Sequence, residues 1–146
     1  MIEKCSFKEI FDIWHNHLWP NRISKIESHS AMLMHGTLTL DNFNYDPSYF
    51  IYKDNNKIIG CNSGHKCQDN SYRSRGLYVF PEFRKQGIGL ELLKATINQG
   101  KFENCNMIWS YPRRSSWSVY QKAGFALLGD WHECENQINA YCVKLL

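Results

Sequence analysis

The sequence of 146 residues lacks the features of a membrane, secreted or nucleic-acid-binding protein. No apolar run approaches the roughly 20 residues that a membrane-spanning helix needs. The first residues, Met1 to Ser6, lack the apolar core of a secretory signal. The net charge of +3 is modest and far from the concentrated basic stripe of a dedicated nucleic-acid binder. We therefore expect a cytoplasmic protein without a membrane or nucleic-acid partner.

The sequence also lacks cysteine and histidine residues at the spacings typical of metal sites. None of the six cysteines belongs to a C-x-x-C pair, so free, reduced thiols are expected. Cys61 and Cys67, with His65 between them, offer three zinc ligands, yet their spacing matches no standard site and no fourth ligand is evident. His15 and His17 are two apart in a predicted helix, so they point in different directions. We predict no bound metal.

The chain shows no linker, internal repeat or low-complexity segment, and its length suits one domain over residues 1–146. An apolar stripe that ends before Pro20 predicts a first helix that ends by Trp19, because proline disfavours helical geometry in the residue before it. Residues 20–47, with Met34, Leu38 and Leu40 among their apolar positions, suggest a second short helix and irregular structure without a decisive period. The later predicted elements are a hairpin of 49–53 and 57–62, a strand over 72–80, a helix from Leu90 to Gly100, a strand over 107–111, a short helix over 116–123 and a hairpin of 125–134 and 138–145.

Together these elements predict an α/β (α+β layered) fold with a mixed, mostly antiparallel central sheet flanked by helices. The most informative segment runs from Leu77 to Leu90. Its first four residues favour a buried strand, and Pro81 removes a ladder donor, so the strand should stop there. Gly87 and Gly89 have no Cβ, so the backbone can approach an anion closely. The open N-terminus of the following helix favours a phosphate or pyrophosphate at this turn.

Two common phosphate-binding patterns are absent, namely G-x-G-x-x-G and G-x-x-x-x-G-K-[ST]. The spacing here is R-x-x-G-x-G, from Arg84 to Gly89. This segment closely resembles the acetyl-CoA-binding motif of the GNAT acetyltransferase superfamily. Downstream, the run Val-Tyr-Gln-Lys-Ala-Gly-Phe from Val119 to Phe125 resembles that family's later Y-x-K-x-G-F segment. The resemblance implies a GNAT-like acyl-CoA N-acyltransferase fold over the whole chain, although only the two motifs are specific.

The resemblance implies acetyl-CoA as the co-substrate. Main-chain N–H groups of the turn would hold its pyrophosphate, and residues 77–79 would pair with its pantetheine arm as a neighbouring strand does. Arg84 matches the family's Arg or Gln at the start of the loop, whereas Arg113 stands where the family frequently has Asn near the cofactor. The predicted cofactor-binding residues are Leu77, Tyr78, Val79, Arg84, Lys85, Gln86, Gly87, Ile88, Gly89, Leu90 and Arg113.

By the same resemblance, Tyr120 is the predicted catalytic residue. A phenol with a pKa of about 10 can protonate the departing CoA thiolate in a dry site, and the alternative is a core aromatic side chain. The general base is not identified, because residues 72–76 and 106–111, where relatives carry a carboxylate, contain neither Asp nor Glu. His132, Glu133 or a water chain to bulk solvent could serve instead.

Arginines near the predicted site leave the charge of the acceptor open. Arg73 and Arg75 lie two apart on a strand, hence on one face, and Arg113 and Arg114 follow the neighbouring strand. They could form a basic cleft for an anionic acceptor such as an amino acid. The alternative, which the sequence favours, is that they are solvated or face the CoA phosphates. The residues that could line the acceptor pocket by family analogy are Trp19, Asn21 and Arg22.

We therefore predict an N-acetyltransferase that transfers an acetyl group from acetyl-CoA to a primary amine of a small molecule or peptide by direct attack. A catalytically weak acyl-CoA-binding sensor or regulatory module with the same fold would explain the missing carboxylates equally well. The prediction is compatible with a homodimer.

Overall fold

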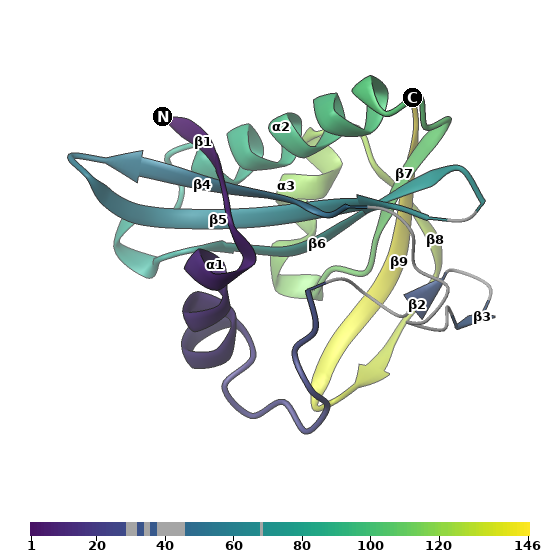
Figure 1. The fold of residues 1–146 in the computed structure, drawn as a ribbon. Coiled ribbons are helices and arrows are strands. Elements are labelled where there is room, and N and C mark those ends of the chain that lie inside the picture. The colour runs from purple at the N-terminus through teal and green to yellow at the C-terminus, as the bar shows by residue number, and fades with distance from the viewer. Residues whose placement is uncertain (29–31, 34–35, 38–45, 68) are drawn as a thin grey trace.

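The computed structural model describes residues 1–28, 32–33, 36–37, 46–67 and 69–146 (Figure 1). Its strands are β1 (Ile2–Cys5), β2 (Met32–Leu33), β3 (Gly36–Thr37), β4 (Ser48–Asp54), β5 (Lys57–Lys66), β6 (Ser71–Val79), β7 (Met107–Ser110), β8 (Ala126–Cys134) and β9 (Gln137–Leu145). Seven of them form one sheet in the order β1-β4-β5-β6-β7-β9-β8, and β2 pairs with β3. Among the described strand pairs only β6 and β7 run parallel. The predicted mixed, mostly antiparallel sheet is confirmed.

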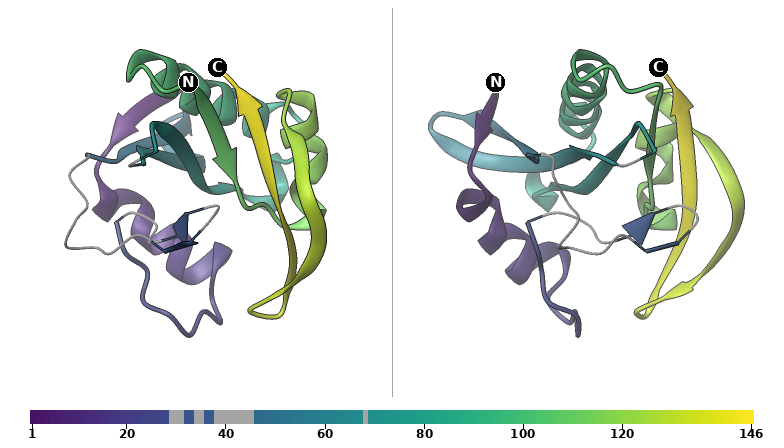
Figure 2. Two further views of the ribbon diagram at one scale, coloured as in Figure 1. Left: turned by 90° about the vertical axis from the view of Figure 1, so that its right-hand side faces the viewer. Right: turned by 45° about the vertical axis from the view of Figure 1, so that its right-hand side comes forward.

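Helices cover both faces of the sheet. On one face α2 (Ile88–Phe102) packs across β4, β5 and β6, and α3 (Trp117–Lys122) follows the 3-10 turn η4 (Arg114–Ser116). On the opposite face lie α1 (Phe7–Ile13) and its π-helical continuation η1 (Trp14–Leu18) (Figure 1). The 3-10 turn η3 (Pro81–Phe83) leads from β6 toward α2. Figure 2 shows both termini on the α2 side, while the β8–β9 hairpin extends to the side that holds α1.

Outside residues 20–47 the predicted elements are present, and some of their ends are shifted. The first helix reaches Leu18 but changes from α to π geometry at Trp14. The prediction that the central helix stops at Gly100 is wrong, because α2 continues to Phe102. Gly100 is buried inside the helix, where an ideal Cβ would lie 3.1 Å from the Tyr72 side chain. The glycine therefore lets α2 pack closely on β6 instead of ending the helix.

The segment between η1 and β4 departs most from expectation. No helix is present in the described part of residues 20–47, which holds irregular chain up to Ser28 and the two short strands β2 and β3. Met34, Leu38 and Leu40, on which the second predicted helix depended, lie outside the described residues. Strand β1 is not among the predicted elements, and it pairs with β4 at the sheet edge.

Candidate functional site

Strand β6 separates from its parallel partner partway along its length. The pairing of β6 with β7 covers only Ser71–Arg73 and Met107–Trp109. Just beyond, the Ser110 hydroxyl donates to the Ser74 carbonyl oxygen at 2.8 Å. No described strand pairs with residues 77–79 on the β7 side. This part of β6 is therefore an internal sheet edge that can offer main-chain groups to an extended ligand.

A bulge at Gly76 bends β6 at the same point. Ser63 pairs with Arg75, whereas Cys61 pairs with Tyr78, so β6 contains an extra residue there. Gly76 has a φ of +83°, and the Trp14 indole N–H donates to its carbonyl oxygen at 2.9 Å. An ideal Cβ at this position would lie 2.4 Å from the Trp14 ring, so only glycine fits beneath the indole.

The turn after β6 has the open shape that the sequence predicts. Lys85 and Gly87 adopt left-handed φ values of +63° and +82°, and Gly87 is the N-cap of α2. No described side chain caps this N-terminus, so the first main-chain N–H groups of α2 are open to a ligand. The Arg84 Nε–H donates to the Val79 carbonyl oxygen at 2.8 Å and so holds the turn against the strand end.

The remaining residues of the predicted cofactor site lie along the same stretch. Residues 77–79 are half-buried and residues 84–87 are exposed, whereas the Ile88 side chain is buried in an apolar cluster with Phe50, Ile59 and Leu92. Ile88 can therefore offer only its main chain to a ligand at the turn. Contact between these residues and a cofactor stays a prediction.

A cavity of about 470 Å³ opens on the α1 side of the sheet, and we call it the larger cavity. Its walls come from η1 with the segment to Glu27, the middle of β6, the β7–η4 connection and the tip of the β8–β9 hairpin. Figure 1 shows the segment after η1 running toward that hairpin tip, and the Ser24 hydroxyl donates to Glu135 Oε1 at 3.3 Å. The volume suits a small molecule.

A smaller cavity of about 70 Å³ adjoins it and shares several of its walls, including Arg73 and Arg75. The smaller cavity is also lined by Leu77, Ser110 and Tyr120. It therefore connects the open edge of β6 with the larger cavity, at the place where a ligand arm lying on that edge would end.

Tyr120 lies between the apolar core and the smaller cavity, with 3% of its surface exposed. Its ring packs edge-on against Phe125, with 5.5 Å between centroids. Burial raises the pKa of the Tyr120 phenol, and the Cys142 thiol adds to the rise, while the Ser110 hydroxyl and the charge of Arg73 oppose it. The phenol is therefore protonated at neutral pH, as a proton donor must be.

Arg73 and Arg75 lie on one face of β6, as predicted, and both side chains are buried, with 6% and 5% exposed. The expectation that they are solvated is wrong for this pair, because rings from other parts of the chain cover them. The Arg73 guanidinium lies 4.3 Å from the centroid of the Trp109 ring. Burial lowers the pKa of Arg73, which reflects the cost of holding a charge away from water.

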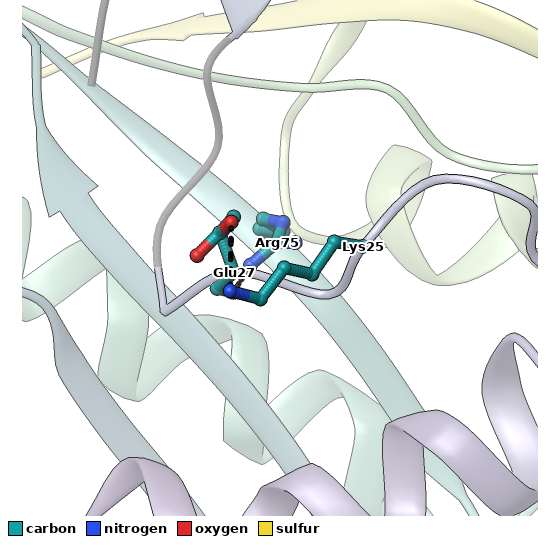
Figure 3. A network of polar contacts seen from close by, with 3 residues as sticks. All are labelled: Lys25, Glu27 and Arg75. Atoms are coloured by element: carbon teal, nitrogen blue, oxygen red, sulfur yellow. Dashed lines mark hydrogen bonds and ion pairs between the residues drawn. The ribbon is translucent and has the colours of Figure 1, made fainter.

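Arg75 lies against two indole rings and the segment after η1. Its guanidinium lies 4.9 Å from the Trp14 ring centroid and 5.1 Å from that of Trp19. Figure 3 shows its Nη1 donating to the Glu27 carbonyl oxygen, at 2.9 Å, while the Glu27 carboxylate pairs with Lys25 at 3.7 Å. Burial lowers the pKa of Arg75 to about 9, and the nearby charges of Arg73 and Arg22 add to this shift.

Arg113 turns toward η1, where its Nη2 donates to the Leu18 carbonyl oxygen. It lines both cavities, and its predicted contact with the cofactor stays a prediction. Arg114, in contrast, is exposed and lines neither cavity. All three residues that were expected at an acceptor pocket lie in the wall of the larger cavity. They are Trp19, Asn21 and Arg22.

The two predicted alternatives for the general base lie outside both cavities. His132 and Glu133 are exposed on β8, and the His132 Nε2 shares a hydrogen bond with the Tyr111 hydroxyl, which belongs to a residue lining both cavities. The carboxylates that do line the larger cavity are Glu27 and Glu135, which the sequence interpretation missed. Glu135 lies in a predicted hairpin turn, which could have indicated it, whereas Glu27 lies in residues 20–47, for which the sequence pattern indicated no definite structure.

No group of three or more His, Cys, Asp or Glu side chains in the described ranges is placed to hold a metal ion. The Cys67 Sγ and His65 Nδ1 atoms are 3.9 Å apart, and all six cysteines are free thiols. Over the same ranges, the chain has no helix with both the length and the apolar character needed to cross a membrane.

Comparison with known proteins adds a family match. The sequence model of the acetyltransferase (GNAT) family matches residues 11–125, a stretch that includes the turn after β6 and the segment ending at Phe125. A search of curated proteins finds no match to this sequence.

Solved structures of acetyltransferases share the fold. A ribosomal-protein-alanine N-acetyltransferase from Brucella melitensis is 14% identical, with a TM-score of 0.69 over 100% of this chain and 99% of that one. A GNAT family acetyltransferase from Elizabethkingia anophelis with acetyl-CoA bound is 22% identical, with a TM-score of 0.58 over 68% of this chain and 76% of that one. An IAA acetyltransferase from Bacillus cereus is 14% identical, with a TM-score of 0.60 over 68% and 78% of the two chains. At these identities the likeness shows a common fold.

Proposed function

The chain belongs to the GNAT acetyltransferase family, and on that basis we propose that it transfers the acetyl group of acetyl-CoA to a primary amine of a small molecule or peptide. One observation carries the proposal. The unpaired edge of β6, the turn after it and the open N-terminus of α2 form a continuous stretch over residues 77–90, which we call the cofactor path. Acetyl-CoA has a matching shape, since an amide-bearing arm joins its thioester to a pyrophosphate.

Each part of the cofactor path suits one part of that ligand. The main chain of residues 77–79 would pair with the pantetheine amides, although the Val79 carbonyl oxygen already accepts from Arg84. The N–H groups from Lys85 to Leu90 would bind the pyrophosphate at the helix N-terminus. The thioester would then reach the smaller cavity, beside Tyr120.

The chemistry needs two proton movements. The amine must lose its proton before attack, because an ammonium with a pKa of about 8 to 10 is mostly charged at neutral pH. Its nitrogen then bonds to the thioester carbon, the carbon–sulfur bond breaks and the thiolate takes the proton of the Tyr120 hydroxyl. The nitrogen loses a second proton as it becomes an amide, and a proton returned through solvent restores the phenol. The proton from the amine would leave to solvent through the larger cavity, where His132 reaches the wall through its hydrogen bond to Tyr111.

Binding and turnover test this proposal separately. Calorimetry with folded protein should show CoA binding, and acetyl-CoA with a broad panel of primary amines should release CoA thiol in step with acetylated product. Failure of the folded protein to bind CoA would end the proposal. Binding without turnover on the whole panel would favour the acyl-CoA sensor instead.

A further inference from the structure

We infer that the acceptor amine carries an anionic group, a carboxylate or a similar oxyanion, that is held by the buried arginines Arg73 and Arg75 in the larger cavity. This inference rests on the proposed function and adds the chemical class of the acceptor. Three observations support it: the balance of charge in the cavity, hydrogen-bonding groups that are unused, and the position of the arginines between the two cavities.

Positive charge predominates in the walls of the larger cavity. Glu27 and Glu135 are the carboxylates among its lining residues; each contacts another side chain, although the charge of Glu27 also acts on Arg75. Glu27 pairs with Lys25 at 3.7 Å, and Glu135 accepts from the Ser24 hydroxyl at 3.3 Å. In the part of the chain that the structure describes, no ion pair joins a cavity arginine to a carboxylate. The basic side chains of the cavity are Arg22, Lys25, Arg73, Arg75 and Arg113.

Arg73 has hydrogen-bond donors that the described protein leaves unused. Its Nε and Nη1 atoms are buried without a hydrogen-bond partner, although the guanidinium is stacked on the Trp109 ring. Stacking covers a face of the guanidinium and leaves its N–H groups, which lie in the plane, without an acceptor; because Nε and Nη1 are closed to solvent, an anion would reach them only with a small shift of the cavity wall. A buried charge without partners is unfavourable, so an anion that accepts from these groups would bind with a favourable free energy.

Arg75 and Arg113 are held in place without being neutralised. Each donates to a main-chain carbonyl oxygen, that of Glu27 for Arg75 and that of Leu18 for Arg113. A carbonyl oxygen accepts a hydrogen bond but carries no formal charge. The guanidinium groups therefore keep their orientation and their positive charge, which is the arrangement that recognises a planar carboxylate.

The position of the arginines limits the distance between the anionic group and the amine. Arg73 and Arg75 line both cavities, and the smaller cavity also contains Tyr120, the predicted proton donor to the thiolate. An anion bound to these arginines would therefore leave an amine on the same small molecule close to the thioester. Amino acids have this arrangement, whereas a polycationic amine would be repelled by the cavity.

Matched pairs of acceptors test the inference. We would compare the standard amino acids that have a primary amine with their α-carboxamides, which keep the amine but lack the charge of the α-carboxylate, and with the corresponding aminophosphonates. The best anionic acceptor should exceed its carboxamide in kcat/KM by about 100-fold, the size expected for paired charge-assisted hydrogen bonds. In Arg73→Gln this preference should fall to within about threefold, while the exposed control Arg114→Gln should keep it. A preference for phosphonates over carboxylates would support the inference and identify the oxyanion.

Several outcomes would overturn the inference while leaving the proposed function intact. One is equal kcat/KM for acids and carboxamides in protein that binds CoA, and another is that only uncharged amines are acetylated. A third is an equal loss of kcat for both acceptor types in Arg73→Gln, since this would assign Arg73 to the thioester. CoA affinity measured by calorimetry reports whether each variant is folded, and Arg75→Gln replaces Arg73→Gln if the latter does not fold. Loss of CoA binding in the unmodified protein would instead defeat the proposed function.

Discussion

The cofactor path and the larger cavity lie on either side of Gly76, and they are built in opposite ways. The path is one segment of chain, residues 77–90, and we propose that it binds its ligand through main-chain groups. The cavity joins segments far apart in sequence, as the contact between Ser24 and Glu135 shows with a sequence separation of 111, and it is lined by side chains. Main-chain recognition can be preserved through extensive sequence change, whereas side-chain recognition changes with single substitutions. The first motif that carries the family resemblance lies in the path, whereas the proposed choice of acceptor depends on the side chains of the cavity.

The largest effect should come from Gly76, where the two regions meet. In Gly76→Ala the new Cβ would need a φ of +83° and would lie 2.4 Å from the fully buried Trp14 ring. We expect the free energy of unfolding to fall by about 3 kcal/mol, from backbone strain and overpacking together. Urea unfolding followed by tryptophan fluorescence measures this loss.

Gly129 provides the matched control for that substitution. It has a similar φ of +96°, but no described atom lies within 4 Å of its ideal Cβ. Gly129→Ala should therefore lose only about 1 kcal/mol of stability, the cost of the backbone conformation alone. If both variants lost the same amount, the close packing of Trp14 on the bulge would be contradicted.

The next largest effect tests the point where the path delivers the thioester. Tyr120→Phe removes the hydroxyl beside the smaller cavity and keeps the ring packed on Phe125. We expect kcat to fall by about 100-fold, with little change in CoA affinity, because a proton donor acts on the departing thiolate and not on the bound ground state. Steady-state kinetics and calorimetry on the same preparation separate the two quantities. Unchanged kcat would remove Tyr120 from the mechanism.

A smaller effect is expected at the other end of the path. Gly87→Glu places a carboxylate beside the proposed pyrophosphate site, and the space around position 87 is open, so the variant should fold. Like-charge repulsion should weaken CoA binding by about 30-fold in calorimetry. Gly129→Glu introduces the same charge at another positive φ, away from the turn, and should bind CoA normally. Retained affinity in Gly87→Glu would contradict the placement of the pyrophosphate.

Sequence patterns predicted the fold best where chain geometry is local. The two hairpin turns are examples, since Asn55 and Asn56, and likewise Glu135 and Asn136, all have positive φ in short polar turns. Gly100 shows where such prediction stops. Glycine is needed at this position because the Tyr72 side chain, which lies on another element, packs closely against it. A residue whose role depends on a distant neighbour carries no local signal of that role.

The same distinction holds within the candidate site. The cofactor path is contiguous, so its strand, turn and helix could be predicted from one motif. That Arg73 and Arg75 share a strand face could also be predicted, but their burial could not. It depends on Trp14 and Trp109, which the fold brings over these arginines from η1 and β7. That Glu27 lines the cavity could not be predicted either, because the cavity is formed by segments that are far apart in the sequence.

The last prediction uses pH to distinguish the larger cavity from the path. Burial lowers the pKa of Arg75 to about 9, so its charge is nearly complete well below this pH, half lost at it and increasingly lost above it. Affinity for a carboxylate analogue without an amine should be constant well below pH 9 with respect to this group, begin to fall as the pH approaches 9, and then fall by up to about tenfold per pH unit. Arg75→Gln should remove this decline in affinity, and the affinity for CoA should not decline over the same pH range.

The fold must be checked at each pH by circular dichroism. Burial raises the pKa of the Cys142 thiol to about 12, so as the pH rises above about 9 the unfolded chain loses the thiol proton before the folded chain does, and stability declines. A flat affinity profile from pH 8 to 10 in folded protein would show that the carboxylate does not bind to Arg75.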